Sequence, residues 1–171
     1  RLEHELDRQI SAVVDEFQNL NNADLNQAAQ HGGWSIAQNL DHLNKYFDYY
    51  NPVIKHALEM AKEDPAADTF HSGWLGRYFT HSMDYRKGTK VKAFKDYIPA
   101  ANLDAAQVVY TFIENEEELL EMLRQAKMYN LTKIRLAICL TKWITMRLGD
   151  VFQFVIMHNE RHIVQAQRVL K

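Results

Sequence analysis

Cysteine is almost absent from the sequence, which contains a single one, Cys139. One thiol rules out an internal disulfide and is too few for a zinc cluster held by thiolates. We therefore expect Cys139 to fill a packing position, in agreement with a reducing, cytoplasmic compartment. Long hydrophobic runs are lacking too, and the first residues have the pattern of an amphipathic helix and not of a signal peptide. We expect no membrane partner.

The chain also lacks an excess of one charge. Its 20 Lys and Arg residues are interspersed among 22 Asp and Glu residues, which gives a formal net charge of −2. This distribution offers no basic surface for the phosphates of nucleic acid, so we expect no nucleic-acid partner. With 171 residues, of which 47% are hydrophobic, the chain is long enough for one continuous core. We expect residues 1–171 to form a single domain.

Hydrophobic residues recur at helical spacing in four stretches of the chain. The first stretch predicts a helix over residues 2–21. The second predicts a helix that begins directly after Ser35, which has the spacing of a capping box with Gln38. Pro52 lacks a backbone donor, so we expect it to kink this helix, which continues toward residues 60–62.

The other two stretches predict a helix from about residue 102 to residue 126 and a last helix over residues 151–170. We expect Gly149 and Asp150 to break the chain before the last helix and to cap it. Four helices of this kind predict an all-α protein with the architecture of a four-helix bundle.

Two connections between these helices are distinctive. Residues 64–101 hold two of the three prolines and three of the six glycines, together with seven aromatic residues. We expect a long crossover anchored by its aromatic side chains, which either lets two helices run parallel or caps a cleft at one end of the bundle. Between residues 130 and 149, apolar residues alternate with polar or small ones, which indicates one extended segment lying on the bundle and not a sheet.

The last predicted helix carries two imidazoles, His158 and His162, one turn apart on its apolar stripe. Two neutral imidazoles at this spacing can turn toward one point, as in helices that present two histidines to zinc. Alternatively, both are core histidines bonded to carbonyls or carboxylates of neighbouring helices, and the spacing leaves both interpretations open. A zinc protease is disfavoured, because Asn159 stands where that motif needs a glutamate and Glu160 projects to the opposite side of the helix.

Other side chains bear on the same site. His42 shares a stripe of the second helix with tyrosines, so it is a candidate for a third imidazole. Trp34, Tyr46 and Tyr49 are candidates for the lining of an entry, although aromatic residues at helical spacing more often belong to the core. Glu116 interrupts the apolar seam of the third helix. We expect Glu116 to form an ion pair at an exposed edge, with a carboxylate directed at a metal or an imidazole as the alternative.

Three segments resemble the DinB-like superfamily of metal-binding four-helix bundles, which includes YfiT-like proteins and thiol-dependent transferases. Residues 33–43 (GWSIAQNLDHL) are similar to the family's tryptophan-serine entry to a helix that carries a metal ligand. Residues 148–152 (LGDVF) are similar to the opening of its last helix, and residues 158–166 (HNERHIVQA) to its closing histidine segment. The resemblance implies a four-helix bundle with a metal site.

The resemblance places the metal ligands on His42, His158 and His162. Relatives often have glutamate directly after the first histidine of the pair, where this chain has Asn159. Three neutral imidazoles leave a divalent ion at least one open position, as in catalytic sites. Zinc and nickel are the expected metals, although imidazole ligands also suit iron, cobalt and manganese.

An open metal position suggests a metal-dependent enzyme that acts on a small molecule. The resemblance favours a transferase that uses a low-molecular-weight thiol as cosubstrate over a hydrolase. No residue is predicted as a general base, so the metal itself would activate the nucleophile. A noncatalytic metal- or ligand-binding bundle is the alternative, and helices with apolar residues on two faces also permit a homodimer.

Overall fold

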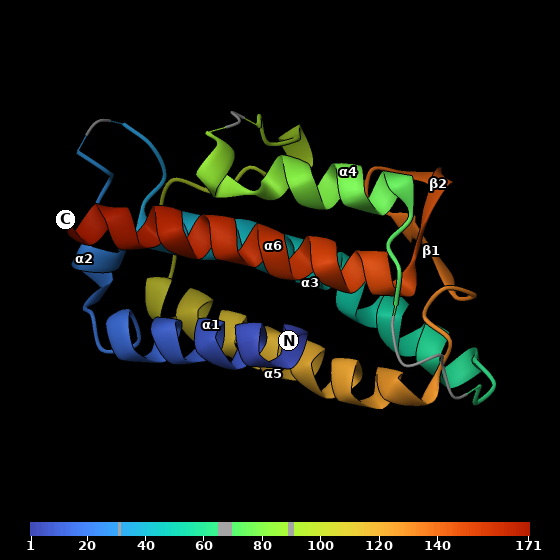
Figure 1. The fold of residues 1–171 in the computed structure, drawn as a ribbon. Coiled ribbons are helices and arrows are strands. Elements are labelled where there is room, and N and C mark those ends of the chain that lie inside the picture. The colour runs from blue at the N-terminus through green and yellow to red at the C-terminus, as the bar shows by residue number, and fades with distance from the viewer. Residues whose placement is uncertain (31, 65–69, 89–90) are drawn as a thin grey trace.

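Four long helices form a bundle in the computed structural model, which describes residues 1–30, 32–64, 70–88 and 91–171 (Figure 1). These helices are α1 (Leu2–Glu16), α3 (Ile36–Met60), α5 (Ala105–Gln125) and α6 (Leu148–Gln167). Both α1 and α3 pack against α5 and α6, so α1 and α3 occupy opposite corners of the bundle. The apolar faces of all four helices contribute to one core. The predicted all-α, four-helix-bundle architecture is confirmed.

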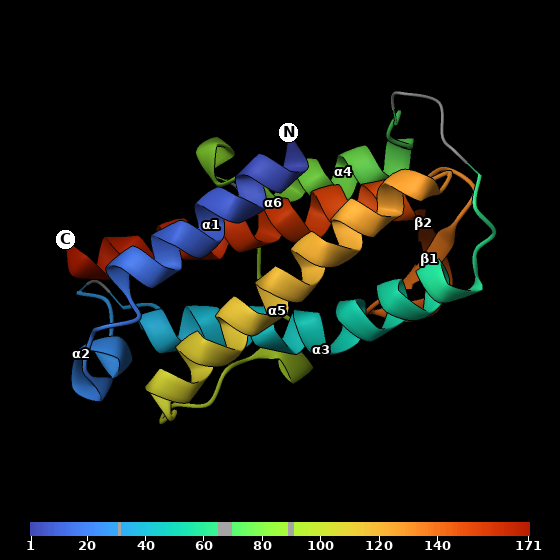
Figure 2. The ribbon, with the colours of Figure 1, turned by 90° about the horizontal axis from the view of Figure 1, so that it is seen from below.

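The helices run in parallel pairs. The colour gradient shows α3 and α5 running in one direction and α1 and α6 in the other, and the view from below agrees (Figures 1 and 2). The chain between α3 and α5 therefore returns along the length of the bundle, as predicted for a long crossover. Its described part contains α4 (Trp74–Met83), which packs on α6, and two short 3₁₀ helices, η1 (Tyr85–Lys87) and η2 (Lys95–Tyr97). Residues 65–69 and 89–90 of the predicted crossover lie outside the described residues.

The N-terminal segment is divided into two helices, whereas the sequence pattern predicted one helix over residues 2–21. Helix α1 ends at Glu16, and α2 (Asn22–Asn26) follows after a short turn. The side-chain oxygen of Asn21 accepts a hydrogen bond from the backbone nitrogen of Asp24, 2.9 Å away. Asn21 is therefore the cap of a new helix, and not the end of the first one.

Helix α3 begins as predicted. Ser35 Oγ accepts a hydrogen bond from the backbone nitrogen of Gln38 (3.1 Å), and Gln38 Oε1 accepts one from the backbone nitrogen of Ser35 (3.0 Å). This capping box fixes the start of the helix, which continues through Pro52 to Met60. The start matters because the first two turns of α3 carry the residues of the site described below.

The extended segment before α6 is a β-hairpin, so the expectation that it would not form a sheet was wrong. Strands β1 (Arg135–Ile138) and β2 (Thr141–Arg147) pair antiparallel, and Cys139 in the turn between them packs against the core. The two-residue turn lacks the glycine or asparagine typical of such turns, and Trp143 and Ile144 are both exposed. A turn of this composition and a strand with exposed apolar side chains do not have the sequence pattern of a hairpin.

Helix α6 begins at Leu148, and Gly149 and Asp150 lie within its first turn, so they do not break the chain as predicted. Both residues instead serve the packing of the crossover on α6. A Cβ atom on Gly149 would lie 2.7 Å from the ring of Phe70. Asp150 Oδ2 accepts a hydrogen bond from the backbone nitrogen of Gly73, at the start of α4 (3.2 Å). None of the helices formed by the described residues is long and apolar enough to cross a membrane.

Candidate metal centre

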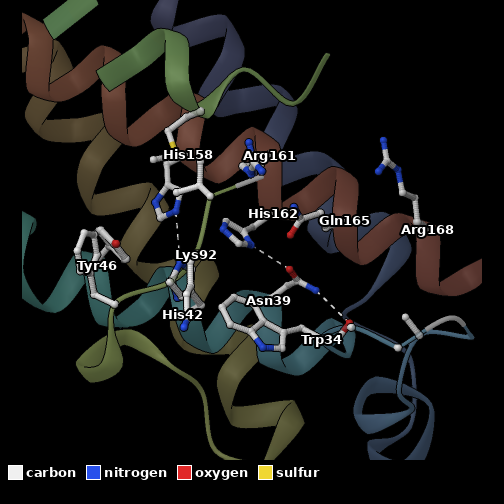
Figure 3. Close-up of a pocket in the computed structure, with 17 residues that line it drawn as sticks. Trp34, Asn39, His42, Tyr46, Lys92, His158, Arg161, His162, Gln165 and Arg168 are labelled. Atoms are coloured by element: carbon white, nitrogen blue, oxygen red, sulfur yellow. Dashed lines mark hydrogen bonds between the residues drawn. The ribbon is translucent and has the colours of Figure 1, made fainter. Parts of the chain in front are cut away.

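Three imidazoles meet between α3 and α6 (Figure 3). His42 belongs to α3, and His158 and His162 belong to successive turns of α6. Each ring offers one nitrogen atom, and these atoms all lie within 4.8 Å of one another. Nε2 of His42 and Nε2 of His158 are 3.3 Å apart. All three side chains are buried, so the fold brings together the three histidines singled out in the sequence.

The long crossover orients His42. Nδ1 of His42 lies 2.7 Å from the carbonyl oxygen of Tyr97, which can only accept a hydrogen bond, so this nitrogen carries the proton. The lone pair of His42 is consequently on Nε2, which faces the other two imidazoles. A backbone carbonyl carries no signal in the sequence, and this contact was not predicted. It gives the crossover a direct role at the site.

A buried amide orients His162 in the same way. The side-chain nitrogen of Asn39 donates a hydrogen bond to the carbonyl oxygen of Ser35 (2.9 Å). The side-chain oxygen of Asn39 therefore faces Nδ1 of His162, at 2.9 Å. Nδ1 of His162 is therefore the donor, and the lone pair is on Nε2. The ring of Trp34 stacks on His162 from the other side, with 5.7 Å between ring centroids. Asn39 was overlooked, although it precedes His42 by three residues and hence shares its helix face.

Removal from water lowers the pKa of all three imidazoles. The pKa of His42 falls to about 4, although its hydrogen bond to Tyr97 opposes this shift. The pKa values of His158 and His162 fall well below the ordinary value, first through burial and then through neighbouring imidazoles and the charge of Arg161. All three rings are neutral at neutral pH, which is the form that binds a metal ion.

The nitrogen atoms of His42 and His158 have the separation that a transition-metal ion requires, and the nitrogen atoms of all three rings lie within 4.8 Å of one another. Bonds from zinc to imidazole are about 2.0–2.1 Å long, so two nitrogens on one tetrahedral ion lie roughly 3.3 Å apart. The separation between His42 and His158 equals this value. Three imidazole nitrogens suit zinc, nickel, iron or cobalt and leave at least one position for another ligand.

A cavity of about 460 Å³, here called the histidine cavity, adjoins the three rings (Figure 3). The described residues that line it are Ala29, Gly32, Gly33, Trp34, Asn39, His42, Tyr46, Met83, Val91, Lys92, Ala93, Phe94, His158, Arg161, His162, Gln165 and Arg168. Tyr46 is buried and packs on His158, with 4.5 Å between ring centroids, so it is both a core residue and part of the wall. Tyr49 is not part of the wall, and its hydroxyl lies 3.2 Å from the carbonyl oxygen of Ala137 in β1.

Comparison with known proteins identifies the family and a solved structure with a similar fold. The sequence matches the DinB superfamily over residues 5–166. The chain belongs to the DinB superfamily. A solved structure with the same fold is YfiT from Bacillus subtilis, described as a probable metal-dependent hydrolase with an unusual four-helix bundle topology. It is 16% identical, with a TM-score of 0.58 over 98% of this chain and 83% of YfiT. No curated protein is significantly similar in sequence.

Asn159 directly follows the first histidine of the pair, and the structure shows what its side chain contacts. Its side chain is buried and faces α5, where Nδ2 donates a hydrogen bond to Oε1 of Glu116 (3.2 Å). Glu116 is itself fully buried, so the prediction of an ion pair at an exposed edge was wrong. Burial raises the pKa of Glu116 well above its ordinary value. A glutamate at position 159 would place a second carboxyl beside Glu116.

Glu160 points away from the imidazoles of this DinB protein, as predicted. Gln9 of α1 donates a hydrogen bond to Oε2 of Glu160 (3.1 Å), and Arg8 of α1 also binds that oxygen. Glu160, the carboxylate nearest to the histidines in the sequence, therefore binds residues of α1 on another face of α6. This arrangement agrees with the expectation that a zinc-protease mechanism is disfavoured.

Proposed function

We propose that this protein is a metal-dependent enzyme in which His42, His158 and His162 hold one divalent transition-metal ion, zinc or nickel. The observation that carries the proposal is the convergence of three neutral, buried imidazoles at the wall of a cavity. Histidines buried only for packing have no need to direct their lone pairs at one point. The rings of His42 and His162 are held in that orientation by fixed acceptors outside the cluster.

A metal ion in this position supplies Lewis acidity, which lowers the pKa of a thiol or water that binds beside it. Hydrogen bonds to Tyr97 and Asn39 orient His42 and His162, and the rings of Trp34 and Tyr46 pack on the cluster. No aspartate or glutamate is among the described residues of the histidine cavity, so none of these can act as a carboxylate base. This composition favours a nucleophile that loses its proton easily.

We infer that the nucleophile is a low-molecular-weight thiol: its S–H proton is lost, its sulfur bonds to an electrophilic carbon of a small substrate, and the bond from that carbon to a leaving group, which takes up a proton, breaks. A thiol has a pKa of about 8.5, far below that of water, so it needs less assistance to ionise. Hydrolysis is the second candidate, and the description of YfiT as a probable metal-dependent hydrolase supports it. A bundle that binds a metal or ligand without turnover is the remaining alternative.

The decisive experiment measures metal content and activity together. Protein purified without a chelating tag is analysed by plasma mass spectrometry as wild type, His42→Ala, His158→Ala and His162→Ala. We expect about one transition-metal ion per wild-type chain and none in the three variants. His56→Ala, which removes an exposed histidine from the same helix as His42, is the matched control and should retain the metal.

Metal-loaded protein is then tested for consumption of a thiol with an electrophile and for hydrolysis of activated amides and esters. Metal-dependent loss of thiol supports the transferase, and metal-dependent hydrolysis without thiol supports the second candidate. Absence of metal after reconstitution would overturn the site itself. Bound metal without either activity would favour the noncatalytic alternative.

A further inference from the structure

We propose that the substrate is a small organic anion, which binds with its anionic group on the cationic residues of the histidine cavity and its reacting end at the imidazoles. The position of the reacting end rests on the proposed metal-dependent function. The anion site does not, because the residues that form it are Lys92, Arg161 and Arg168.

The charge of the cavity differs from that of the whole chain. The chain has slightly more acidic than basic residues, 22 against 20. Three cationic side chains line the cavity, and none of the other described lining residues is an aspartate or glutamate. The imidazoles are neutral, so a divalent ion between them adds to the positive charge. A cavity with this potential attracts anions and disfavours cationic ligands.

Arg161 in α6 and Arg168, directly after the end of α6, continue the helix face of His158. Arg161, Gln165 and Arg168 succeed His158 at intervals of three or four residues, which places them at neighbouring positions along one helical face. At 1.5 Å per residue, Arg168 lies about 9 Å beyond His162 along the axis. The face therefore leads from the imidazoles past Arg161 and Gln165 to the exposed Arg168.

We assign the main contact with the anionic group to the guanidinium of Arg161. Only 8% of the surface of Arg161 is exposed, whereas Lys92 and Arg168 are exposed. An anion bound between this guanidinium and the proposed metal ion would be attracted by both positive charges. The planar guanidinium also matches the two oxygens of a carboxylate or phosphate, and the neighbouring amide of Gln165 adds hydrogen-bonding capacity.

The remaining wall defines the body of the ligand. Trp34, Met83 and Phe94 provide apolar surface next to the cationic residues. A cavity of about 460 Å³ is suited to a small molecule and not to a macromolecule. The substrate class that fits both parts of the wall is an apolar or aromatic body with a carboxylate or phosphate at one end.

The test compares an acid with its neutral amide. Binding of 4-phenylbutyrate, phenyl phosphate and 4-phenylbutyramide to metal-loaded protein is measured by isothermal titration calorimetry. We expect at least one of the two anions to bind about tenfold or more tightly than the amide. The anion with the higher affinity identifies which oxyanion the site prefers.

Charge-neutral variants locate the anion. Arg161→Gln should weaken binding of the anion by about tenfold or more, and Lys92→Gln and Arg168→Gln by roughly threefold to tenfold, with amide binding unchanged. Because Lys92 and Arg168 are exposed, their variants keep the test valid if Arg161→Gln does not fold. Arg135→Gln and Lys142→Gln, on the exposed surface of the hairpin, are matched controls and should bind like the wild type.

The same measurements on metal-free protein separate this inference from the proposed function. If the protein binds no metal but still selects the anion through Arg161, the anion site stands and the metal-dependent function fails. If metal is retained and the three charge variants bind the anion as tightly as the wild type, the inference is overturned, because the anion is then held by the metal alone. Equal affinities for anions and amide would overturn it as well.

Discussion

The side-chain oxygen of Asn39 accepts a hydrogen bond from Nδ1 of His162, 2.9 Å away, and so determines which nitrogen of that ring faces the cavity. Asn39 and His42 lie one turn apart on α3, so a single helix supplies one proposed ligand and orients another. A proposed ligand on α6 thereby depends on the placement of α3. The contact leads to the first of four predictions.

Asn39→Ala should weaken metal binding by about tenfold to a hundredfold, because His162 loses the acceptor that fixes its tautomer and orientation. Asn39→Asp keeps an acceptor oxygen and should retain most of the affinity. Affinity is measured by competition with a chromophoric chelator. The control is Asn51→Ala, which removes another buried asparagine of α3 that bonds to the carbonyl oxygen of Asn115 (3.0 Å) far along the helix. Equal effects of Asn39→Ala and Asn51→Ala would contradict the proposed role.

Glu116 should make the stability of the metal-free protein fall as the pH rises. Its pKa is raised by burial, so between its ordinary value and its folded-state value the folded protein binds more protons than the unfolded chain. The contribution of Glu116 to the free energy of unfolding is therefore greatest in acid and declines as the pH increases above about 4.5. Glu116→Gln retains the acceptor for Asn159 and cannot ionise.

Urea unfolding at pH 5 and pH 7 tests this prediction. The change in the free energy of unfolding from pH 5 to pH 7 should be more favourable to stability in Glu116→Gln than in the wild type, and the variant should be at least as stable as the wild type at pH 7. Glu117→Gln removes the neighbouring exposed carboxylate and should follow the wild type. A steeper decline in Glu116→Gln than in the wild type would show that the carboxyl is ionised in the folded protein.

Metal loading should stabilise the fold. An ion that binds only the folded protein raises the midpoint of thermal unfolding by roughly 5–10 °C when its free concentration is about 100 times Kd. The shift should disappear in His162→Ala and persist in His56→Ala. Calorimetry with and without a chelator gives the measurement. A shift of the same size in His162→Ala would place the stabilising ion elsewhere.

Gly76→Ala should destabilise the docking of α4 on α6. A Cβ atom at this position would lie 2.1 Å from the side chain of Asp150, so one of the two helices must move. We expect a loss of about 1–3 kcal/mol in the free energy of unfolding, as for other overpacked contacts. Ser82→Ala, in the last turn of the same helix, should cost less than Gly76→Ala. Chemical denaturation of both variants decides the comparison.

The sequence was sufficient to predict the bundle and the three convergent histidines, because both depend on regular helical spacing. His158 and His162 share a face by periodicity, and the capping box at Ser35 fixes the start of α3, which carries His42. Contacts that depend on the crossover could not be predicted. The carbonyl oxygen of Tyr97 is common to every residue type, and its distance from His42 depends on the path of a long irregular segment.

The error at Glu116 has a similar origin. A carboxyl in an apolar seam is ordinarily placed at an exposed edge, since burial of its charge is costly. The protein avoids this cost by raising the pKa of Glu116 and by pairing it with Asn159 on another helix. Recognition of this pair requires knowledge of which helices are neighbours. The hairpin was missed because its second strand has no buried face in its first half.

The distribution of the three histidines over the chain affects when the centre can assemble. His42 is on α3, and the other two imidazoles are on α6, which follows every other long helix. A nascent chain that has not yet produced α6 carries one of the three nitrogens and cannot retain an ion. Capture of the ion that we propose would consequently be a late event in biogenesis, and its retention would distinguish chains that contain α6 from chains that end before it.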